Sequence, residues 1–214
     1  MSNRRRGIVV LDYGIGNLAS AQRALVHIGA DARLVSDPAE AEGADGVVLP
    51  GVGAFGRCAE ALRESGLDAV ARRAIEDEVP FLGICVGLQL LYEDSEEAPG
   101  VAGLGALAGT VRRLGAGVKC PQIQWNLLRR RGECPSQILA GLPEEPWVYF
   151  VHSYAPPIGP ETVATCEYGG EVAAAIESGP LWGTQFHPEK SGSLGLAVLR
   201  NFAARIAVSN APAR

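Results

Sequence analysis

The segment that most constrains the fold of this chain is residues 79–91, which read VPFLGICVGLQLL. It opens as an apolar run of strand length behind Pro80, a residue that strands tolerate at their start but not in their middle. The run then passes through Gly83, Cys85 and Gly87 into a helical pattern. A nucleophile flanked by glycines, between a buried strand and a helix, is typical of the nucleophile elbow of α/β enzymes.

Cys85 is the candidate nucleophile of this elbow. The glycines on either side suit a turn too sharp for neighbouring side chains, in which the nucleophile takes a strained backbone conformation. Free N–H groups and the dipole at the start of the following helix favour a thiolate over a thiol. A buried structural cysteine in a glycine-rich turn is the alternative. Only a base elsewhere in the chain separates the two interpretations.

The composition is that of an ordinary globular protein: of 214 residues, 47% are hydrophobic and 20% are charged, which suits one domain with a full core. A net charge of −5 gives no electrostatic reason to expect nucleic acid or an anionic membrane as the main partner. No apolar run approaches the ~20 residues of a membrane span, and the N-terminus lacks the apolar core of a secretory signal. We therefore expect a cytoplasmic protein.

The cysteines are odd in number, widely scattered and never in C-x-x-C spacing, so they indicate neither a disulfide framework nor a zinc site. They are Cys58, Cys85, Cys120, Cys134 and Cys166. In a reducing cytosol we expect free thiols. The sequence indicates no metal and no other cofactor.

The first 91 residues alternate strand-like and helix-like segments. The expected strands are residues 7–11, 32–35, 45–49 and the run before Cys85. The expected helices are residues 18–28, 58–62 and 67–75. This order predicts a parallel sheet with right-handed crossovers, whose ligands bind at the carboxyl ends of the strands. The loops 12–17 and 50–56 and Cys85 fall at those ends, so they point to one face.

Beyond Tyr92 the pattern changes. Residues 93–100 are acidic and rich in turn formers, and shorter strand-like runs follow. These runs are residues 109–114, 123–128, 148–151, 163–167, 172–176 and 181–186. We interpret them as an antiparallel extension with edge strands.

A terminal helix is expected over residues 194–208. Its core face repeats at helical spacing and consists of Leu194, Val198, Phe202 and Ile206. No linker divides the chain, so we expect a single domain over residues 7–209, between a disordered tail at 1–6 and a C-terminal tail at 210–214.

A glycine-rich loop lies next to the elbow in the expected sheet. Gly51, Gly53 and Gly56 follow a strand, and such a loop brings backbone N–H groups close to a ligand. Beside a nucleophile, this is where an oxyanion hole would form.

Gly14, Gly16 and Ala19 superficially match a dinucleotide-binding fingerprint, with Asp37 at a suitable distance for a ribose contact. The glycines begin two residues after the apparent end of the strand, however, and a lone fingerprint is weak support for a cofactor. We favour a tight turn between strand and helix.

His187 is the candidate base. Residues 183–189 (GTQFHPE) end a strand at Pro188, which stops the ladder and exposes His187 and Glu189 at the strand end. A cysteine nucleophile needs a base, and the base needs an acceptor that orients it. Cys85, His187 and Glu189 therefore meet the requirements of a catalytic triad.

These residues resemble a known family, the class I (triad-type) glutamine amidotransferases. GICVGLQ (83–89) resembles the family's nucleophile motif, QFHPE (185–189) resembles its histidine–glutamate motif, and the resemblance covers nearly the whole chain. It implies a three-layer α/β fold: a mostly parallel central sheet flanked by helices, of flavodoxin-like type, with an antiparallel extension.

Four features resemble the glutaminase subunits of imidazole glycerol phosphate synthases. They are DYGIGN (12–17), PGVGAF (50–55), YFVHSY (149–154) and Lys190 directly after the triad glutamate. The segment KCPQIQWN (119–126) matches imperfectly, because the family commonly has an aliphatic residue where Cys120 stands and glycine where Gln124 stands. This departure concerns the local shape of the edge that would face a partner, not the chemistry.

The resemblance implies that L-glutamine is hydrolysed to glutamate and ammonia by Cys85, His187 and Glu189. It places the oxyanion hole at Gly51, Val52, Gly53 and Val86. It assigns glutamine binding to Gln89, Ser153 and Tyr154. It implies that four residues face a partner: Asn17, Trp125, Tyr149 and Lys190. That partner would be a (β/α)8-barrel cyclase in a heterodimer, which uses the ammonia to make imidazole glycerol phosphate and an aminoimidazole carboxamide ribotide in histidine biosynthesis.

Two other functions stay open at this point. The same glutaminase chemistry could serve a different synthase, of the pyridoxal phosphate or anthranilate type. Alternatively, Cys85 could be an oxidisable thiol in a non-enzymatic redox sensor or binding module. A nicotinamide-dependent dehydrogenase is a distant third, since only Gly14 and Gly16 support it.

Overall fold

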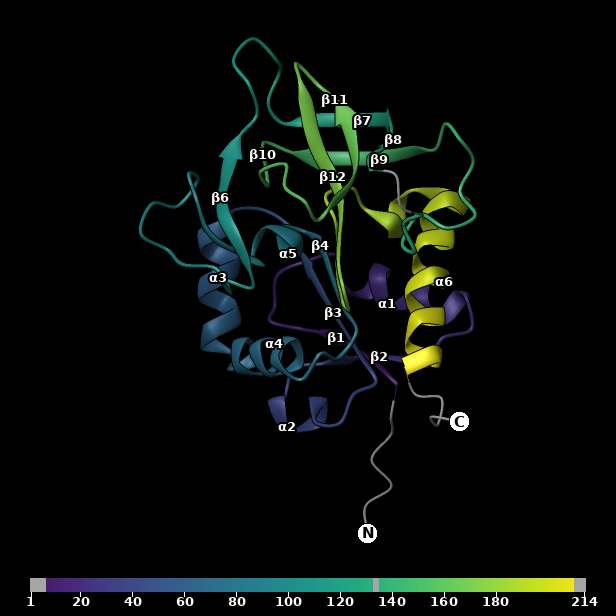
Figure 1. Cartoon of the computed structure of the whole chain (residues 1–214). Coiled ribbons are helices and arrows are strands. Elements are labelled where there is room, and N and C mark those ends of the chain that lie inside the picture. The colour runs from purple at the N-terminus through teal and green to yellow at the C-terminus, as the bar shows by residue number, and fades with distance from the viewer. Residues whose placement is uncertain (1–6, 133–134, 210–214) are drawn as a thin grey trace.

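The structure is a computed structural model that describes residues 7–132 and 135–209. The tails expected at 1–6 and 210–214 lie outside the described residues. An eight-stranded sheet forms the centre of the molecule, in the order β2-β1-β3-β4-β13-β12-β11-β8 (Figure 1). Its strands are β1 (Ile8–Leu11), β2 (Ala32–Val35), β3 (Gly46–Gly51), β4 (Phe81–Cys85), β8 (Arg129–Arg130), β11 (Thr162–Glu167), β12 (Glu171–Ser178) and β13 (Leu181–Thr184).

The first five strands in this order are parallel, and β12, β11 and β8 continue the sheet antiparallel. β1, β3 and β4 are buried along their whole length, as expected of parallel strands covered on both faces. The expected three-layer α/β fold is therefore confirmed.

β13 differs from the expectation. The sequence placed residues 181–186 in an antiparallel extension with edge strands, whereas β13 lies inside the sheet, parallel to β4 and antiparallel to β12. All four of its residues are buried. A short apolar run indicates burial on both faces, but it contains nothing that selects the neighbouring strand.

Helices cover both faces of the sheet. They are α1 (Leu18–His27), α2 (Pro38–Ala41), α3 (Phe55–Glu64), α4 (Leu67–Glu76), α5 (Val86–Gln89), the 3-10 turn η1 (Pro188–Lys190) and α6 (Gly192–Ser209). α1 and α6 pack together on one face, and α3 and α4 on the other (Figure 1). α6 buries Val198, Phe202 and Ile206 as expected, whereas Leu194 is only half-buried. No described helix is both long enough and apolar enough to cross a bilayer.

Two smaller sheets lie above the carboxyl ends of the parallel strands (Figure 1). One contains β5 (Tyr92–Ser95), β6 (Leu107–Arg113) and β10 (Tyr154–Ala155), and the other β7 (Gln122–Leu127) and β9 (Trp147–His152). β5 occupies a segment in which only turns were expected, and it pairs parallel with β6. The sequence did not predict this strand because Glu93 and Asp94 are exposed and acidic, which is typical of a turn. Only Tyr92 and Ser95 of the strand are buried.

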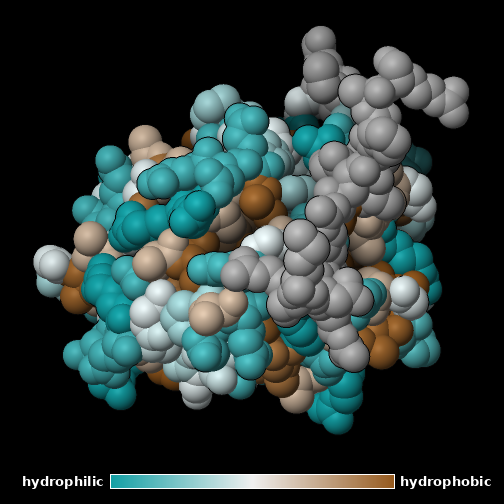
Figure 2. Space-filling model, turned by 90° about the horizontal axis from the view of Figure 1, so that it is seen from below, coloured by the Kyte–Doolittle hydropathy of each residue, from teal (hydrophilic) through white to brown (hydrophobic). Residues whose placement is uncertain are grey.

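The opposite face of the molecule, seen from below, carries hydrophilic and hydrophobic side chains intermixed (Figure 2). No strand of the two small sheets reaches this side in Figure 1. The two ends of the molecule therefore differ: the upper end carries the loops that follow the parallel strands, and these loops hold the candidate catalytic residues.

Candidate active site

Cys85 forms a strained turn between β4 and α5. It is the last residue of β4, and α5 begins at Val86. Its backbone has φ +55° and ψ −110°, in a region that residues with a side chain rarely adopt. This is the conformation expected of a nucleophile elbow.

The flanking glycines are required by close backbone contacts. A Cβ on Gly87 would lie 1.8 Å from the carbonyl oxygen of Leu49, and one on Gly83 would lie 2.8 Å from the carbonyl oxygen of Gly87. Real Cβ atoms essentially never come this close to backbone atoms. The glycine spacing read from the sequence thus has a steric cause: α5 packs directly on β3 and β4.

His187 and Glu189 form a buried pair. His187 Nδ1 lies 2.8 Å from Glu189 Oε1, and each side chain is 2% exposed. A carboxylate can only accept, so Nδ1 carries the proton and donates it. His187 Nε2 has no hydrogen-bond partner among the described residues, and His187 lines the same cavity as Cys85. The ring is therefore oriented by Glu189, with its other nitrogen left for the thiol.

The electrostatics of His187 favour its charged form. Burial lowers the pKa of His187, but the neighbouring Cys85 and Glu189 raise it by more, so that the pKa reaches about 10, against an ordinary value of 6.5. A thiolate at Cys85 and the Glu189 carboxylate both stabilise a protonated imidazole. This arrangement suits a thiolate–imidazolium pair, the form in which a cysteine attacks a carbonyl carbon.

Cys85 and His187 line a cavity of about 320 Å³. Six residues assigned to the oxyanion hole or to glutamine line it: Val52, Gly53, Val86, Gln89, Ser153 and Tyr154. Gly51, the seventh assigned residue, is not in the lining but pairs with Cys85 across β3 and β4. A Cβ on Gly51 would come within 2.8 Å of Gly87 N and 2.9 Å of the Tyr13 hydroxyl. A pocket of this size has room for a free amino acid.

The structure adds residues to which the sequence assigned no role. Gln185 Nε2 lies 3.5 Å from Cys85 Sγ, and Gln185 Oε1 accepts a hydrogen bond from Gln89 Nε2 at 3.1 Å. The cavity is also lined by Glu97, Pro121, Val151 and His152. Gln185 stands in the same motif as His187, so its position in the sequence could have marked it as a candidate site residue. The sequence around Glu97 is typical of an acidic turn and gives no sign that Glu97 belongs to the site.

The residues assigned to the partner gather around η1. Asn17 Nδ2 donates to Glu189 Oε1 at 3.2 Å, so Asn17 contacts the triad itself. The backbone N–H of His187 donates to the carbonyl of Tyr149 at 3.0 Å, and the ring of Tyr149 lies 6.1 Å from that of Trp125. Lys190 is exposed at the end of η1. None of the four lines the cavity.

The loop after β1 is a tight turn, as expected. The side chain of Asp12 accepts a hydrogen bond from Gly14 N at 3.1 Å, which closes the turn locally. Asp37, the residue considered for a ribose contact, caps α2 by accepting from Ala39 N at 2.9 Å. Both features have a structural role that needs no dinucleotide.

The described cysteines are free thiols, as predicted: Cys58, Cys85, Cys120 and Cys166. Cys134 lies outside the described residues. The distance between Cys58 Sγ and the carbonyl oxygen of Val52 is 3.2 Å, so that this thiol donates to the glycine-rich loop.

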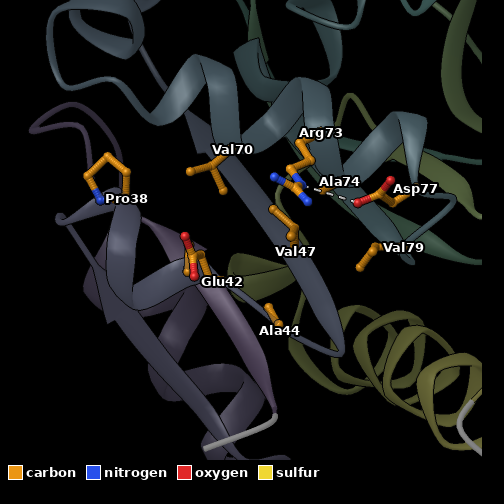
Figure 3. A pocket seen from close by; sticks show the side chains of 11 residues that line it. Pro38, Glu42, Ala44, Val47, Val70, Arg73, Ala74, Asp77 and Val79 are labelled. Carbon is orange, nitrogen blue, oxygen red and sulfur yellow. Dashed lines mark hydrogen bonds and ion pairs between the residues drawn. The ribbon is translucent and has the colours of Figure 1, made fainter. Parts of the chain in front are cut away.

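A second cavity, of about 370 Å³, lies between α2, α4 and the starts of β3 and β4 (Figure 3). Val47, Val70 and Val79 contribute aliphatic side chains to it, and Arg73 pairs with Asp77 at 3.4 Å on its rim. Its lining contains no thiol, hydroxyl or imidazole. The cavity at Cys85 is therefore the candidate active site.

Comparison with known proteins agrees with this geometry. Residues 9–206 match the family model described as glutamine amidotransferase class-I. The chain belongs to the class-I glutamine amidotransferases. Relatives named imidazole glycerol phosphate synthase subunit HisH include one from Moorella thermoacetica, 48% identical over 92% of this chain and 94% of the relative. Another, from Methanothermobacter thermautotrophicus, is 50% identical over 91% and 96%.

The fold of the amidotransferase family also recurs at lower identity. A crystal structure described as a glutamine amidotransferase superposes with a TM-score of 0.71 at 22% identity, over 94% of this chain and 98% of the other. At this identity the likeness concerns the fold alone. It agrees with the α/β architecture described above.

Proposed function

We propose that this chain is the glutaminase subunit of an imidazole glycerol phosphate synthase. It hydrolyses L-glutamine to glutamate and ammonia and delivers the ammonia to a (β/α)8-barrel cyclase, with which it forms a heterodimer in the cytoplasm. The observation that carries the proposal is one cavity lined by both Cys85 and His187. Cys85 lies on a strained elbow, and Glu189 accepts a hydrogen bond from His187. The relatives named above supply the identity of the synthase.

The first half of the reaction forms a thioester. Cys85 Sγ attacks the side-chain amide carbon of glutamine while its proton resides on His187 Nε2. The imidazolium then gives that proton to the departing nitrogen, which leaves as ammonia. Glu189 keeps the imidazole in the required tautomer and stabilises its positive charge.

The second half hydrolyses the γ-glutamyl thioester. His187 takes a proton from water, and the resulting hydroxide attacks the thioester carbon, which releases glutamate and restores Cys85. In both halves the tetrahedral oxyanion accepts hydrogen bonds from Val86 N–H and from an N–H of the loop at Gly51–Gly53. Loss of one such donor typically lowers turnover by about 10²–10³-fold.

Recognition of the amino acid uses the rest of the cavity. Ser153 and Tyr154 bind the α-amino and α-carboxylate groups. Glu97 adds an acidic oxygen to the same lining, the chemistry that an α-ammonium group requires. Gln89 supports this wall, because its Nε2 donates to the carbonyl of Tyr154 at 2.9 Å.

The partner surface is the exposed face of β7 and β9. Ile123, Trp125 and Trp147 are 58%, 48% and 51% exposed and lie on these two paired strands. Large aromatic and aliphatic side chains exposed together are typical of protein interfaces. The face adjoins η1 through Tyr149, so a bound cyclase contacts the strand that supports His187. Asn17 and Lys190 flank the same turn.

The test is glutamate release from L-glutamine by the purified chain, alone and with the cyclase subunit loaded with its nucleotide ligand. We expect strong stimulation by the loaded cyclase, and no activity for Cys85→Ala in either condition. Stimulation by a pyridoxal phosphate or anthranilate synthase instead would reassign the partner. Full activity of His187→Asn would contradict the triad and favour the redox or binding role of Cys85.

A further inference from the structure

His152 is a buried imidazole to which the mechanism above assigns no task. It is 5% exposed, ends β9, and lines the same cavity as Cys85 and His187. Its Nδ1 lies 2.8 Å from the carbonyl oxygen of Tyr154, whereas its Nε2 is buried and has no hydrogen-bond partner among the described residues. A buried polar atom without a partner is costly, so its presence in a ligand cavity calls for a functional explanation.

The contact with Tyr154 determines the tautomer of His152. A backbone carbonyl can only accept, so Nδ1 carries the hydrogen and Nε2 of the neutral ring presents a lone pair. The ring is neutral at ordinary pH, because burial, together with the charge of His187, lowers the pKa of His152 to about 4 despite the contact with Tyr154. His152 therefore offers the cavity a hydrogen-bond acceptor that carries no charge.

His152 lines the same cavity as the nucleophile and follows in the chain a residue that contacts it. Cys85 Sγ lies 3.8 Å from the carbonyl oxygen of Val151, the residue that precedes His152. The bond under attack must lie at Cys85, so the carboxamide of the substrate occupies this part of the cavity. The α-ammonium group has a better partner in the carboxylate of Glu97, since a cation pairs more strongly with an anion than with a neutral ring.

We propose that His152 Nε2 accepts a hydrogen bond from the carboxamide –NH2 of glutamine and so selects the amide over side chains that lack this donor. This inference rests on the proposed glutaminase function. A γ-carboxylate or γ-ester has no N–H to donate, and binding it leaves the buried Nε2 unpaired. Sites built around one polar contact reject analogues that lack the matching group far better than apolar pockets reject a change in size.

The experiment compares two substrates in one complex of the chain with its cyclase. L-Glutamine and L-glutamate γ-methyl ester share the carbonyl carbon, the thioester and the product glutamate, and they differ in the –NH2 group. The measured quantity is the ratio of kcat/KM for the amide to kcat/KM for the ester. A ratio within one protein preparation does not depend on the fraction that is correctly folded.

His152→Asn keeps a donor at the Nδ1 position for Tyr154 and removes Nε2. We expect the ratio to fall about 10- to 100-fold, because a buried –NH2 is left without its acceptor. His152→Gln carries an amide oxygen that reaches the Nε2 position, and we expect it to restore most of the preference. His27→Asn, at an exposed histidine of α1, is the matched control and leaves the ratio unchanged.

Three outcomes would overturn the inference. Equal losses for both substrates in His152→Asn would mean that His152 supports the fold, the α-amino group or the attacking water, none of which distinguishes amide from ester. An unchanged ratio would mean that Nε2 does not contact the carboxamide. Wild-type protein that releases glutamate from neither substrate would remove the proposed function as well, whereas the first two outcomes leave that function intact.

Discussion

Glu189 is the residue on which the charge state of His187 depends most directly after Cys85. Its carboxylate is buried with the imidazole and accepts from both His187 Nδ1 and Asn17 Nδ2. The raised pKa of His187 favours the protonated ring in the folded protein. This contribution to stability is complete below pH 6.5, and it is lost as the pH rises through about 10.

Glu189→Gln should therefore lower the pH at which His187 titrates. We expect a change of about one to three pH units, the range typical of an ion-pair partner. The measurement is an NMR titration of the histidine ring nitrogens, with exposed His27 as the internal reference. Glu177→Gln is the control, because Glu177 accepts from Ser136 and Gln137, outside the cavity lining. An unchanged titration of His187 in Glu189→Gln would show that the pair does not set its charge.

At the residue scale the sequence located the candidate nucleophile, the candidate base and its acceptor, because each sits in a short motif with its own backbone requirement. It gave no role to His152, Glu97 or Gln185. His152 and Gln185 stand inside the quoted motifs, but only the fold shows that His152 and Glu97 line the cavity of Cys85 and that Gln185 contacts its thiol. Asn17 was predicted for the partner, and the structure adds a hydrogen bond from its amide to Glu189.

Among the elements, the junction of β4 and α5 has the strictest packing. Gly87 sits where a Cβ would overlap the carbonyl of Leu49 on β3. Because backbone atoms cannot move aside as a flexible side chain can, even one added carbon must push α5 away from the sheet. Cys85, the first residue before α5, would move with it.

Gly87→Ala should thus lower both stability and activity. We expect the free energy of unfolding to fall by about 3 kcal/mol or more, the upper end for overpacked sites, with loss of glutamate release. Chemical denaturation measures the first effect. Gly115→Ala is the matched control: its nearest contact would be Gly169 O at 3.4 Å, and we expect a change below about 1 kcal/mol. Similar behaviour of the two variants would contradict the steric role of Gly87.

For the whole molecule, the exposed apolar face of β7 and β9 predicts where the cyclase binds. Trp125 is 48% exposed, so its removal has little effect on the isolated chain, whereas a tryptophan in the centre of an interface often carries much of the affinity. Its ring contacts Tyr149, whose carbonyl binds the backbone of His187. A partner bound at this face would therefore contact a residue, Tyr149, that is hydrogen-bonded to His187.

Trp125→Ala should weaken the complex with the cyclase by about 2 kcal/mol or more, which is roughly 30-fold in Kd, and leave the melting temperature of the free chain nearly unchanged. Titration calorimetry gives the affinity. Val26→Ala, at a side chain of similar exposure (49%) on α1, is the control and should bind as the unmodified chain does. Unaltered affinity of Trp125→Ala would place the interface elsewhere.

The sequence by itself determined the strand–helix alternation of the N-terminal half, the elbow, the histidine–glutamate motif and, through resemblance, the family that the comparisons confirm. These are local properties: periodicity, glycine spacing and turn residues act within a few positions. Only the tertiary structure decided that β13 lies between β4 and β12, that β5 forms a strand, and that His152 and Glu97 share a cavity with Cys85. Those features depend on which distant segments pack together. The hydrophobic effect favours burial of any apolar residue, but it does not determine which other segment packs against that residue.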